Sequence, residues 1–124
     1  MVNKVFLLGR LTADPDVRAL PSGSFVANLR LATNTYAGKE EDGTRKEHTD
    51  FHSLVAFERL AELAGELLRK GRLLYVEGRL RHRTWENSEG QKRHTTEVVV
   101  TGFQLLEPKP AGVDGDVAEL ASAG

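Results

Sequence analysis

The sequence predicts a mostly β domain with a single α-helix. Several segments alternate apolar and polar residues with the period of two that is typical of strands. One segment, 60–68, changes to the helical period, and turn residues such as Pro, Gly and Asp separate the segments. At 124 residues, 40% of them apolar, the chain is long enough for one domain with a hydrophobic core.

Five strands are expected, at residues 2–11, 24–35, about 48–57, 72–85 and 92–106. The Asp14-Pro15 step ends the first strand, because proline restricts the residue before it. A charged stretch at residues 37–47, centred on Asp42-Gly43, predicts a mobile hairpin loop between the second and third strands.

The helix is predicted from one apolar stripe with helical spacing, formed by Leu60, Leu63, Ala64, Leu67 and Leu68. Arg69 and Lys70 suit the negative end of this helix, and Gly71 suits the C′ position that follows it. The helix therefore lies between strands three and four, which is the arrangement of a five-stranded OB-fold Greek-key barrel. We expect this domain over residues 1–107, followed by a short disordered tail at 108–124 that is rich in Pro, Gly and Ala.

The composition narrows the possible environment and partners. The chain has no cysteine, hence no disulfide or thiolate metal site, and no apolar run approaches a membrane span. The short apolar stretch at the N-terminus does not fit a secretory signal, which favours an intracellular protein. The net charge of −1 argues at first against a nucleic-acid partner. However, the phosphates of a nucleic acid bind to a local stripe of cations, so the net charge of the whole chain does not decide the question.

Such a stripe occurs within residues 72–85. With a period of two, one side of this strand carries Tyr75, Glu77, Arg79, Arg81, Arg83 and Trp85. One interpretation is a solvated outer face that protects a sheet edge. The other is a surface for single-stranded nucleic acid, in which cations follow the phosphates and aromatic rings stack on the bases.

Other candidates allow two interpretations each. Phe51 and Phe57 share one side of their strand, and periodicity alone favours the barrel core for both. Tyr36 begins a charged loop, so a binding role and a structural role are equally compatible with its position. Glycines within strands, at Gly9 and Gly78, are best explained by barrel bends or close backbone approach.

The best metal or acid–base candidate is the alternating set His48, Asp50 and His52. A nuclease centre is the enzymatic hypothesis that this set allows, but His82 and His94 add no further ligand pattern. Structural or subunit-contact roles fit these histidines better. We therefore expect no catalytic residue, no metal and no cofactor.

Many short motifs resemble the bacterial single-stranded DNA-binding protein family, in order and with its spacing, over about residues 2–106. They are Asn3-Lys4-Val5, Leu8-Gly9-Arg10-Leu11, Asp14-Pro15-Asp16-Val17-Arg18, Ala27-Asn28-Leu29, Leu31-Ala32-Thr33, His48-Thr49-Asp50-Phe51-His52, Leu68-Arg69-Lys70-Gly71, Tyr75-Val76-Glu77-Gly78-Arg79-Leu80-Arg81, Trp85 and Thr95-Thr96-Glu97-Val98-Val99-Val100.

The resemblance implies a non-enzymatic homotetramer that binds single-stranded DNA in replication, repair and recombination, in the cytoplasm at the nucleoid. It implies base stacking by Phe51, Phe57 and Trp85, with Tyr36 near a fourth such position. It assigns phosphate contacts to Arg18, Arg59, Arg69, Lys70, Arg81 and Arg83, to which the stripe adds Arg79. Assembly contacts are implied for Asn3, Lys4, His52 and Tyr75, which moves Tyr75 out of the DNA-binding stripe.

The chain departs from the family pattern at several positions. Phe51 and Tyr36 stand where many members have Trp, and Ser53 and Thr84 replace common basic residues. The family recruits partner proteins through an acidic tip ending in Pro-Phe, which residues 121–124 do not match. The resemblance therefore does not predict whether partner proteins bind, and we expect either a truncated chain or a short paralogue. The alternative function is a primosomal-type OB-fold adaptor that acts mainly through protein partners.

Overall fold

The structure is a computed structural model, and it describes residues 1–106 and 121–122. Its elements are β1 (Val5–Leu11), β2 (Asp16–Ala19), β3 (Phe25–Lys39), β4 (Arg45–Phe57), α1 (Arg59–Leu67), β5 (Leu73–Glu86), β6 (Lys92–Leu105) and β7 (Ala121–Ser122). The mostly β domain with one helix is confirmed for the described part of the chain.

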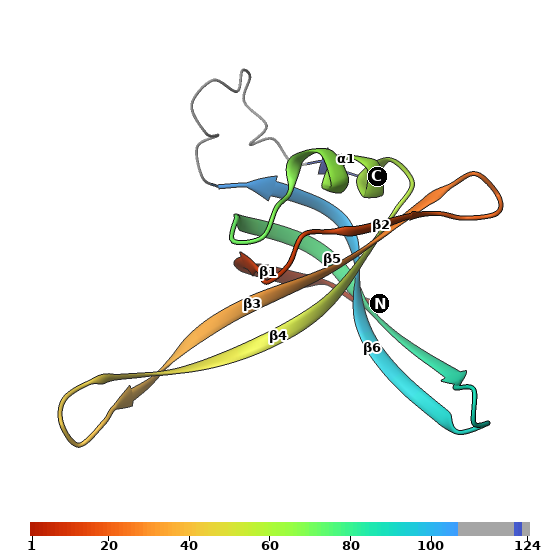
Figure 1. The fold of residues 1–124 in the computed structure, drawn as a ribbon. Coiled ribbons are helices and arrows are strands. Elements are labelled where there is room, and N and C mark those ends of the chain that lie inside the picture. The colour runs from red at the N-terminus through yellow and green to blue at the C-terminus, as the bar shows by residue number, and fades with distance from the viewer. Residues whose placement is uncertain (107–120, 123–124) are drawn as a thin grey trace.

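The strands form one strongly curved sheet in the order β1-β5-β6-β4-β3-β2. Two residue pairs also join β1 to β3, at Arg10↔Ala32 and Leu11↔Leu31. The β4–β6 contact is parallel and equally short. This is the partly open barrel of an OB fold. In Figure 1, α1 covers one end of the barrel, and the β3–β4 and β5–β6 hairpins extend away from it as two arms.

The helix lies between β4 and β5, whereas the sequence predicts it between strands three and four. The difference arises because no pattern in the sequence predicts the four-residue strand β2 (Asp16–Ala19). All four of its residues are exposed, so no alternation of buried positions marks it, and it forms by backbone pairing with the start of β3. The predicted strands 24–35 and 48–57 correspond to β3 and β4.

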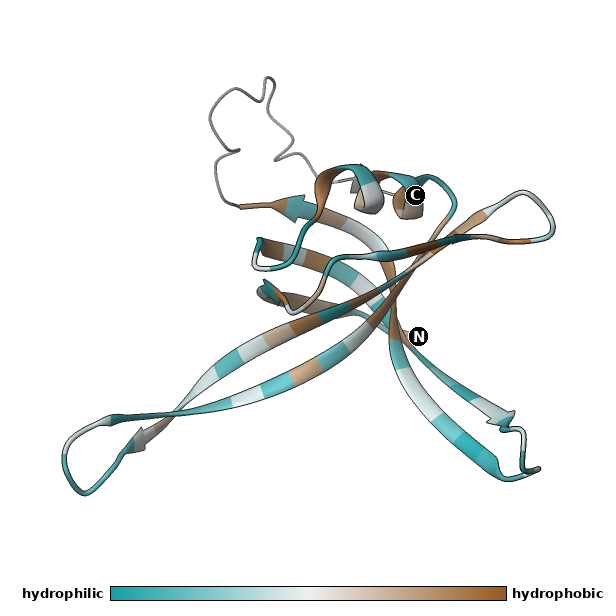
Figure 2. Ribbon diagram, in the orientation of Figure 1, coloured by the Kyte–Doolittle hydropathy of each residue, from teal (hydrophilic) through white to brown (hydrophobic). Residues whose placement is uncertain are grey.

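The predicted loop at 37–47 is too long. Strand pairing continues to Lys39↔Arg45, so only a tight turn remains between the two strands. In this turn, the Asp42 carboxylate accepts the Thr44 N–H at 2.9 Å, and Gly43 has a positive φ of 89°. The charged residues of this stretch form strands through cross-strand hydrogen bonds rather than through burial. Figure 2 shows that both arms become more hydrophilic toward their tips.

The core lies between α1 and the concave side of the sheet. Its largest fully buried side chains are Phe103, Leu31, Leu54, Leu68, Leu74, Leu105 and Val76. Of the predicted helical stripe, Leu60, Ala64 and Leu68 are buried, and Leu63 and Leu67 are half-buried against the core. Most of the predicted disordered tail lies outside the described residues. Within it, Ala121 and Ser122 pair with Phe103 and Gly102 of β6.

The end of α1 differs in part from the prediction. Arg69 Nη1 donates to the carbonyl oxygens of Gly65 and Leu68 at 2.7 and 2.6 Å, as expected for a cation at the negative helix end. The prediction of Gly71 at C′ is wrong, because the helix ends with Leu68 in an extended conformation. Gly71 instead forms a later turn, where its N–H donates to the Leu11 carbonyl at 2.8 Å.

Close backbone approach explains the two strand glycines, as predicted. A Cβ on Gly9 would overlap the Ala32 carbonyl oxygen, where β1 meets β3. A Cβ on Gly78 would overlap the Val99 carbonyl oxygen on β6. These glycines therefore allow the strands to meet tightly around the barrel.

Candidate nucleic-acid interface

Strand register brings residues from five strands to one outer surface. Residues directly opposite in a sheet share a side, and so do alternate residues of one strand. Arg81 lies opposite Glu97, and the next residue on that side, Val99, pairs with Val55 of β4. We call this surface the aromatic face; it carries Tyr36, Phe51, Phe57 and Trp85 together with Arg18, Arg30, Arg79, Arg81, Arg83 and Arg93.

The aromatic face includes only the later part of the predicted stripe on β5. A register shift between Glu77 and Gly78 interrupts the pairing of β5 with β6. Before this shift, the Tyr75 hydroxyl donates to Glu77 at 2.9 Å, and Tyr75 and Glu77 lie opposite Leu8 and Phe6 of β1. Tyr75 and Glu77 therefore lie beside β1, whereas the segment from Arg79 to Trp85 lies on the aromatic face.

All four rings of the aromatic face are accessible to solvent. The exposed fractions are 51% for Tyr36, 56% for Phe51, 36% for Phe57 and 42% for Trp85. The core interpretation of Phe51 and Phe57 is therefore wrong. On β4 the side chains of the core cluster belong to Leu54 and Ala56, which have the opposite parity, whereas Val55 is buried on the same side as Phe51 and Phe57.

Arginine side chains lie over three of these rings. Arg45 lies 4.8 Å from the Tyr36 ring centre. Arg30 and Arg81 each lie 5.5 Å from a ring centre, over Phe51 and Phe57 respectively. These distances are typical of cation–π contacts. Each of these three rings therefore has a guanidinium group beside it, which places a charge next to a stacking position.

Three arginines near these rings are not predicted as binding residues from the sequence: Arg30, Arg45 and Arg93. The alternation in residues 24–35 does place Arg30 on the outer side of its strand. Its position beside Phe51 depends, however, on the pairing of β3 with β4, in which Arg30 lies opposite Ser53. The sequence does not specify that register.

A buried carboxylate holds two arginines at the centre of the aromatic face. Glu97 is only 6% exposed, and its Oε1 accepts hydrogen bonds from Arg81 Nε at 3.0 Å and Arg83 Nε at 2.9 Å. Arg81 Nη2 donates to the same oxygen. Farther along the arm, Trp85 Nε1 donates to Thr95 Oγ1 at 2.9 Å, which fixes the orientation of the indole.

The pKa of Glu97 reflects two opposing effects. Burial raises the pKa of this carboxyl, but the hydrogen bonds and charges of Arg81 and Arg83 lower it more, so the net pKa lies below the ordinary value. A lowered folded-state pKa contributes stability at neutral pH that is lost as the pH falls through that pKa.

We therefore expect the free energy of unfolding to fall on acidification from about pH 4.3, the ordinary Glu pKa, downward. The Glu97→Gln variant lacks this titration, so its stability should depend less on pH in that range. Urea unfolding of both proteins between about pH 3 and 6 isolates the effect of Glu97 from that of the other carboxylates. Parallel pH curves for the two proteins would contradict the expectation.

The other predicted phosphate-binding residues are dispersed. Arg18 is on the aromatic face through its pairing with Val26, and it forms an exposed salt bridge with Asp16 at 2.9 Å. Arg59 begins α1 and contacts Glu62 at 3.2 Å. Arg69 and Lys70 follow the other end of α1, where the backbone N–H of Lys70 donates to Asp14 Oδ1 at 2.8 Å.

The histidines of β4 do not converge on one point. His48 Nε2 lies 3.1 Å from Asp50 Oδ1, whereas His52 Nε2 lies 2.8 Å from Thr33 Oγ1. Within residues 1–106 and 121–122, no group of three His, Cys, Asp or Glu side chains could hold a metal ion.

The predicted assembly residues lie mainly around β1. The Asn3 side chain bonds both the N–H and the carbonyl of Leu80 at 2.9 Å, which extends β1 along the edge of β5. Lys4 is exposed next to it. On the outer side of β1, Phe6 and Leu8 are 60% and 56% exposed, beside Tyr75. His52 is separate from this group, on the inner side of β4 opposite Leu31.

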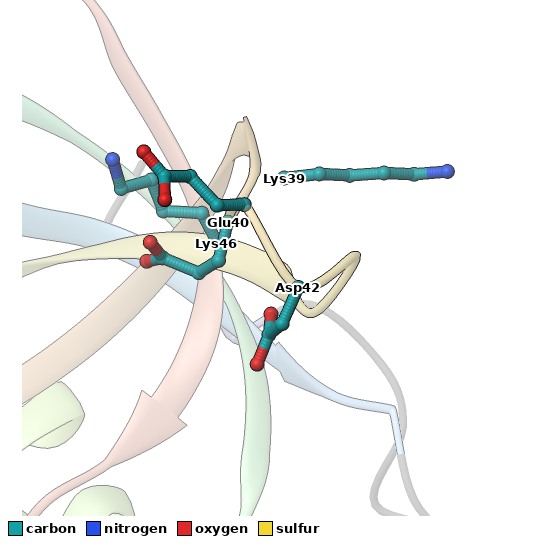
Figure 3. A pocket seen from close by; sticks show the side chains of 5 residues that line it. Lys39, Glu40, Asp42 and Lys46 are labelled. Atoms are coloured by element: carbon teal, nitrogen blue, oxygen red, sulfur yellow. The ribbon is translucent and has the colours of Figure 1, made fainter.

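Hollows in the surface occur along the β3–β4 arm. One of about 290 Å³ is lined by Tyr36, Lys39 and Arg45, beside the ring of Tyr36. A second, of about 520 Å³, lies at the tip and is lined by Lys39, Glu40, Glu41, Asp42 and Lys46. Figure 3 shows that Lys39 and Asp42 point in different directions at this tip. The charges there diverge, so the tip does not form a converging set of ligands.

In the described part of the chain, no helix has the length and apolar character needed to cross a membrane. The solved structures that are similar to the chain include two proteins that bind single-stranded DNA. One is a Plasmodium falciparum SSB complex with single-stranded DNA, with 32% identity and a TM-score of 0.76 over 86% of this chain and 97% of that one.

The other structure is a deletion mutant of the single-stranded DNA binding protein of Thermus aquaticus, with 40% identity and a TM-score of 0.72. The match covers 86% of this chain and 51% of that one, so this chain spans about half the length of the Thermus chain in that structure. The model of the single-strand binding protein family matches residues 2–106, the whole barrel and both arms. The chain therefore belongs to the single-strand binding protein family.

Proposed function

We propose that the chain binds single-stranded DNA along the aromatic face, without strong sequence preference and without catalysis. The observation that carries this proposal is the shared register of four exposed rings and several arginines on one surface. Rings stack on any base, because every base has a π-face, while arginines neutralise phosphates.

The arrangement of the two arms supports a path for an extended strand. Tyr36 and Phe51 lie on the β3–β4 arm, and Trp85 lies on the β5–β6 arm, with Phe57 between them near the barrel. Three rings have a guanidinium group within 5.5 Å of their centre. Bases and the phosphates that connect them could therefore be contacted at the same positions. The Plasmodium relative, whose structure contains single-stranded DNA, matches this chain over 97% of its own length.

Members of this family commonly assemble as tetramers, and we propose the same assembly here. The surface that would form it includes exposed Phe6 and Leu8 on β1, with Asn3, Lys4 and Tyr75 beside them. Burial of exposed apolar side chains is the main favourable contribution to such association. Roles in replication, repair and recombination would follow from binding of exposed single strands.

Titration with oligo(dT) at several salt concentrations tests the proposed function. Trp85 is the only tryptophan, so its fluorescence reports directly on the aromatic face. We expect quenching on binding and an affinity that falls with salt, with a slope of about −0.7 per neutralised phosphate. An unchanged emission together with an affinity independent of salt would contradict the proposal, and a duplex of equal length serves as the control ligand.

A further inference from the structure

Arg81 and Arg83 have different environments, although both contact Glu97. Arg81 uses two of its nitrogens, Nε and Nη2, on the Glu97 carboxylate, and its guanidinium lies over the Phe57 ring at 5.5 Å. Its side chain is 32% exposed. Arg81 is therefore held between a buried anion and an aromatic ring, which leaves little of its donor surface for another partner.

Arg83 is held by one nitrogen only. Its Nε donates to Glu97, and its side chain is 48% exposed. Within residues 1–106, the hydrogen bonds and ion pairs of Arg83 do not involve Nη1 or Nη2. The outer edge of this guanidinium therefore presents two nitrogens to solvent, in the geometry that binds two phosphate oxygens at once.

We propose that Glu97 and Arg81 form a positioning pair, in which Arg81 supports the Phe57 ring and Glu97 orients Arg83, so that only Arg83 of the two arginines contacts phosphate. This inference rests on the proposed function. It assigns separate roles to two arginines that the family resemblance treats alike, and it gives Glu97 a role in DNA binding. One carboxylate fixes both guanidinium groups before DNA arrives, which lowers the ordering cost of binding.

The charge balance agrees with these roles. Glu97 carries one negative charge and lies nearly buried between the two cations, so it reduces the repulsion between the two guanidinium groups. Removal of Arg81 would leave Glu97 paired with Arg83 Nε, so no buried charge is left alone. Arg81 variants can therefore be compared with Arg83 variants without orphaning the carboxylate.

The salt dependence of oligo(dT) affinity tests the inference. A residue that contacts phosphate contributes about 0.7 to the slope of log K against log salt. We expect Arg83→Gln to reduce the slope by about this amount. Arg81→Gln should leave the slope unchanged and weaken binding by roughly two- to five-fold, the effect of losing a cation–π contact. Arg81→Lys keeps the charge but loses the forked contact with Glu97, so it should not restore the affinity.

A double-mutant cycle with Phe57→Ala identifies how Arg81 acts. If Arg81 acts through the ring, Arg81→Gln has no further effect on affinity once Phe57 is alanine, whereas Arg83→Gln keeps its full effect in that background. Equal slope changes for Arg81→Gln and Arg83→Gln, or full recovery of affinity by Arg81→Lys, would overturn the inference. A wild-type protein that does not bind oligo(dT) would instead refute the proposed function, so the two failures are distinguishable.

Discussion

Replacement of Phe51 and Trp85 together by alanine is expected to weaken binding of single-stranded DNA by about 2–6 kcal/mol. This is the sum of two stacking contacts of about 1–3 kcal/mol each, and it corresponds to a rise in Kd of at least about thirty-fold. The two rings lie on different arms, so their effects should be nearly additive. Fluorescence anisotropy of a labelled oligo(dT) measures the loss, since the double variant has no tryptophan.

A matched control for this experiment is Leu80→Ala. Leu80 lies on the same strand as Trp85 and has the same exposed fraction, 42%, but it points to the opposite side of β5. It should leave the affinity within about two-fold of wild type, because it does not face the DNA path. If Leu80→Ala weakened binding as much as Trp85→Ala, the DNA path would not be confined to the aromatic face.

Much of this fold could be predicted from local patterns. The helix is marked by a change of period at 60–68, and three strands by alternation, because burial on one side imposes both patterns. Strand β2 and the outer parts of the β3–β4 arm could not be predicted in the same way. Their residues are exposed on both sides, so they form through cross-strand hydrogen bonds that leave no apolar period in the sequence.

The candidate site, like the fold, could be predicted from the sequence only in part. Arg79, Arg81, Arg83 and Trp85 were predictable as one stripe, because they alternate within a single strand. The position of this stripe relative to Phe51 and Phe57 depends on the short parallel contact Val55↔Val99, between strands far apart in the chain. Glu97 was also not singled out, since a lone acid in the run TTEVVV gives no sign that two arginines of another strand converge on it.

Phenylalanine residues on the two sides of the sheet should respond very differently to the same substitution. Phe103 is 2% exposed, among the largest buried side chains of the core, and lies opposite Val76. Phe103→Ala is expected to lower the free energy of unfolding by about 3–5 kcal/mol, through lost burial and the cavity left behind. Phe51→Ala should change it by less than about 1 kcal/mol, because that ring is already 56% exposed.

Urea unfolding at one fixed protein concentration measures both changes, since association would otherwise shift the apparent stability. Phe103→Leu is the intermediate variant, and it should recover most of the loss because it refills most of the cavity. Folding stability and DNA affinity should therefore respond to different substitutions. Phe103→Ala lowers the stability, and its folded fraction should keep the affinity for DNA. Phe51→Ala weakens DNA binding and leaves the stability nearly unchanged. A large loss of stability in Phe51→Ala would mean that its ring packs in the core after all, and the aromatic face would lose one of its four rings.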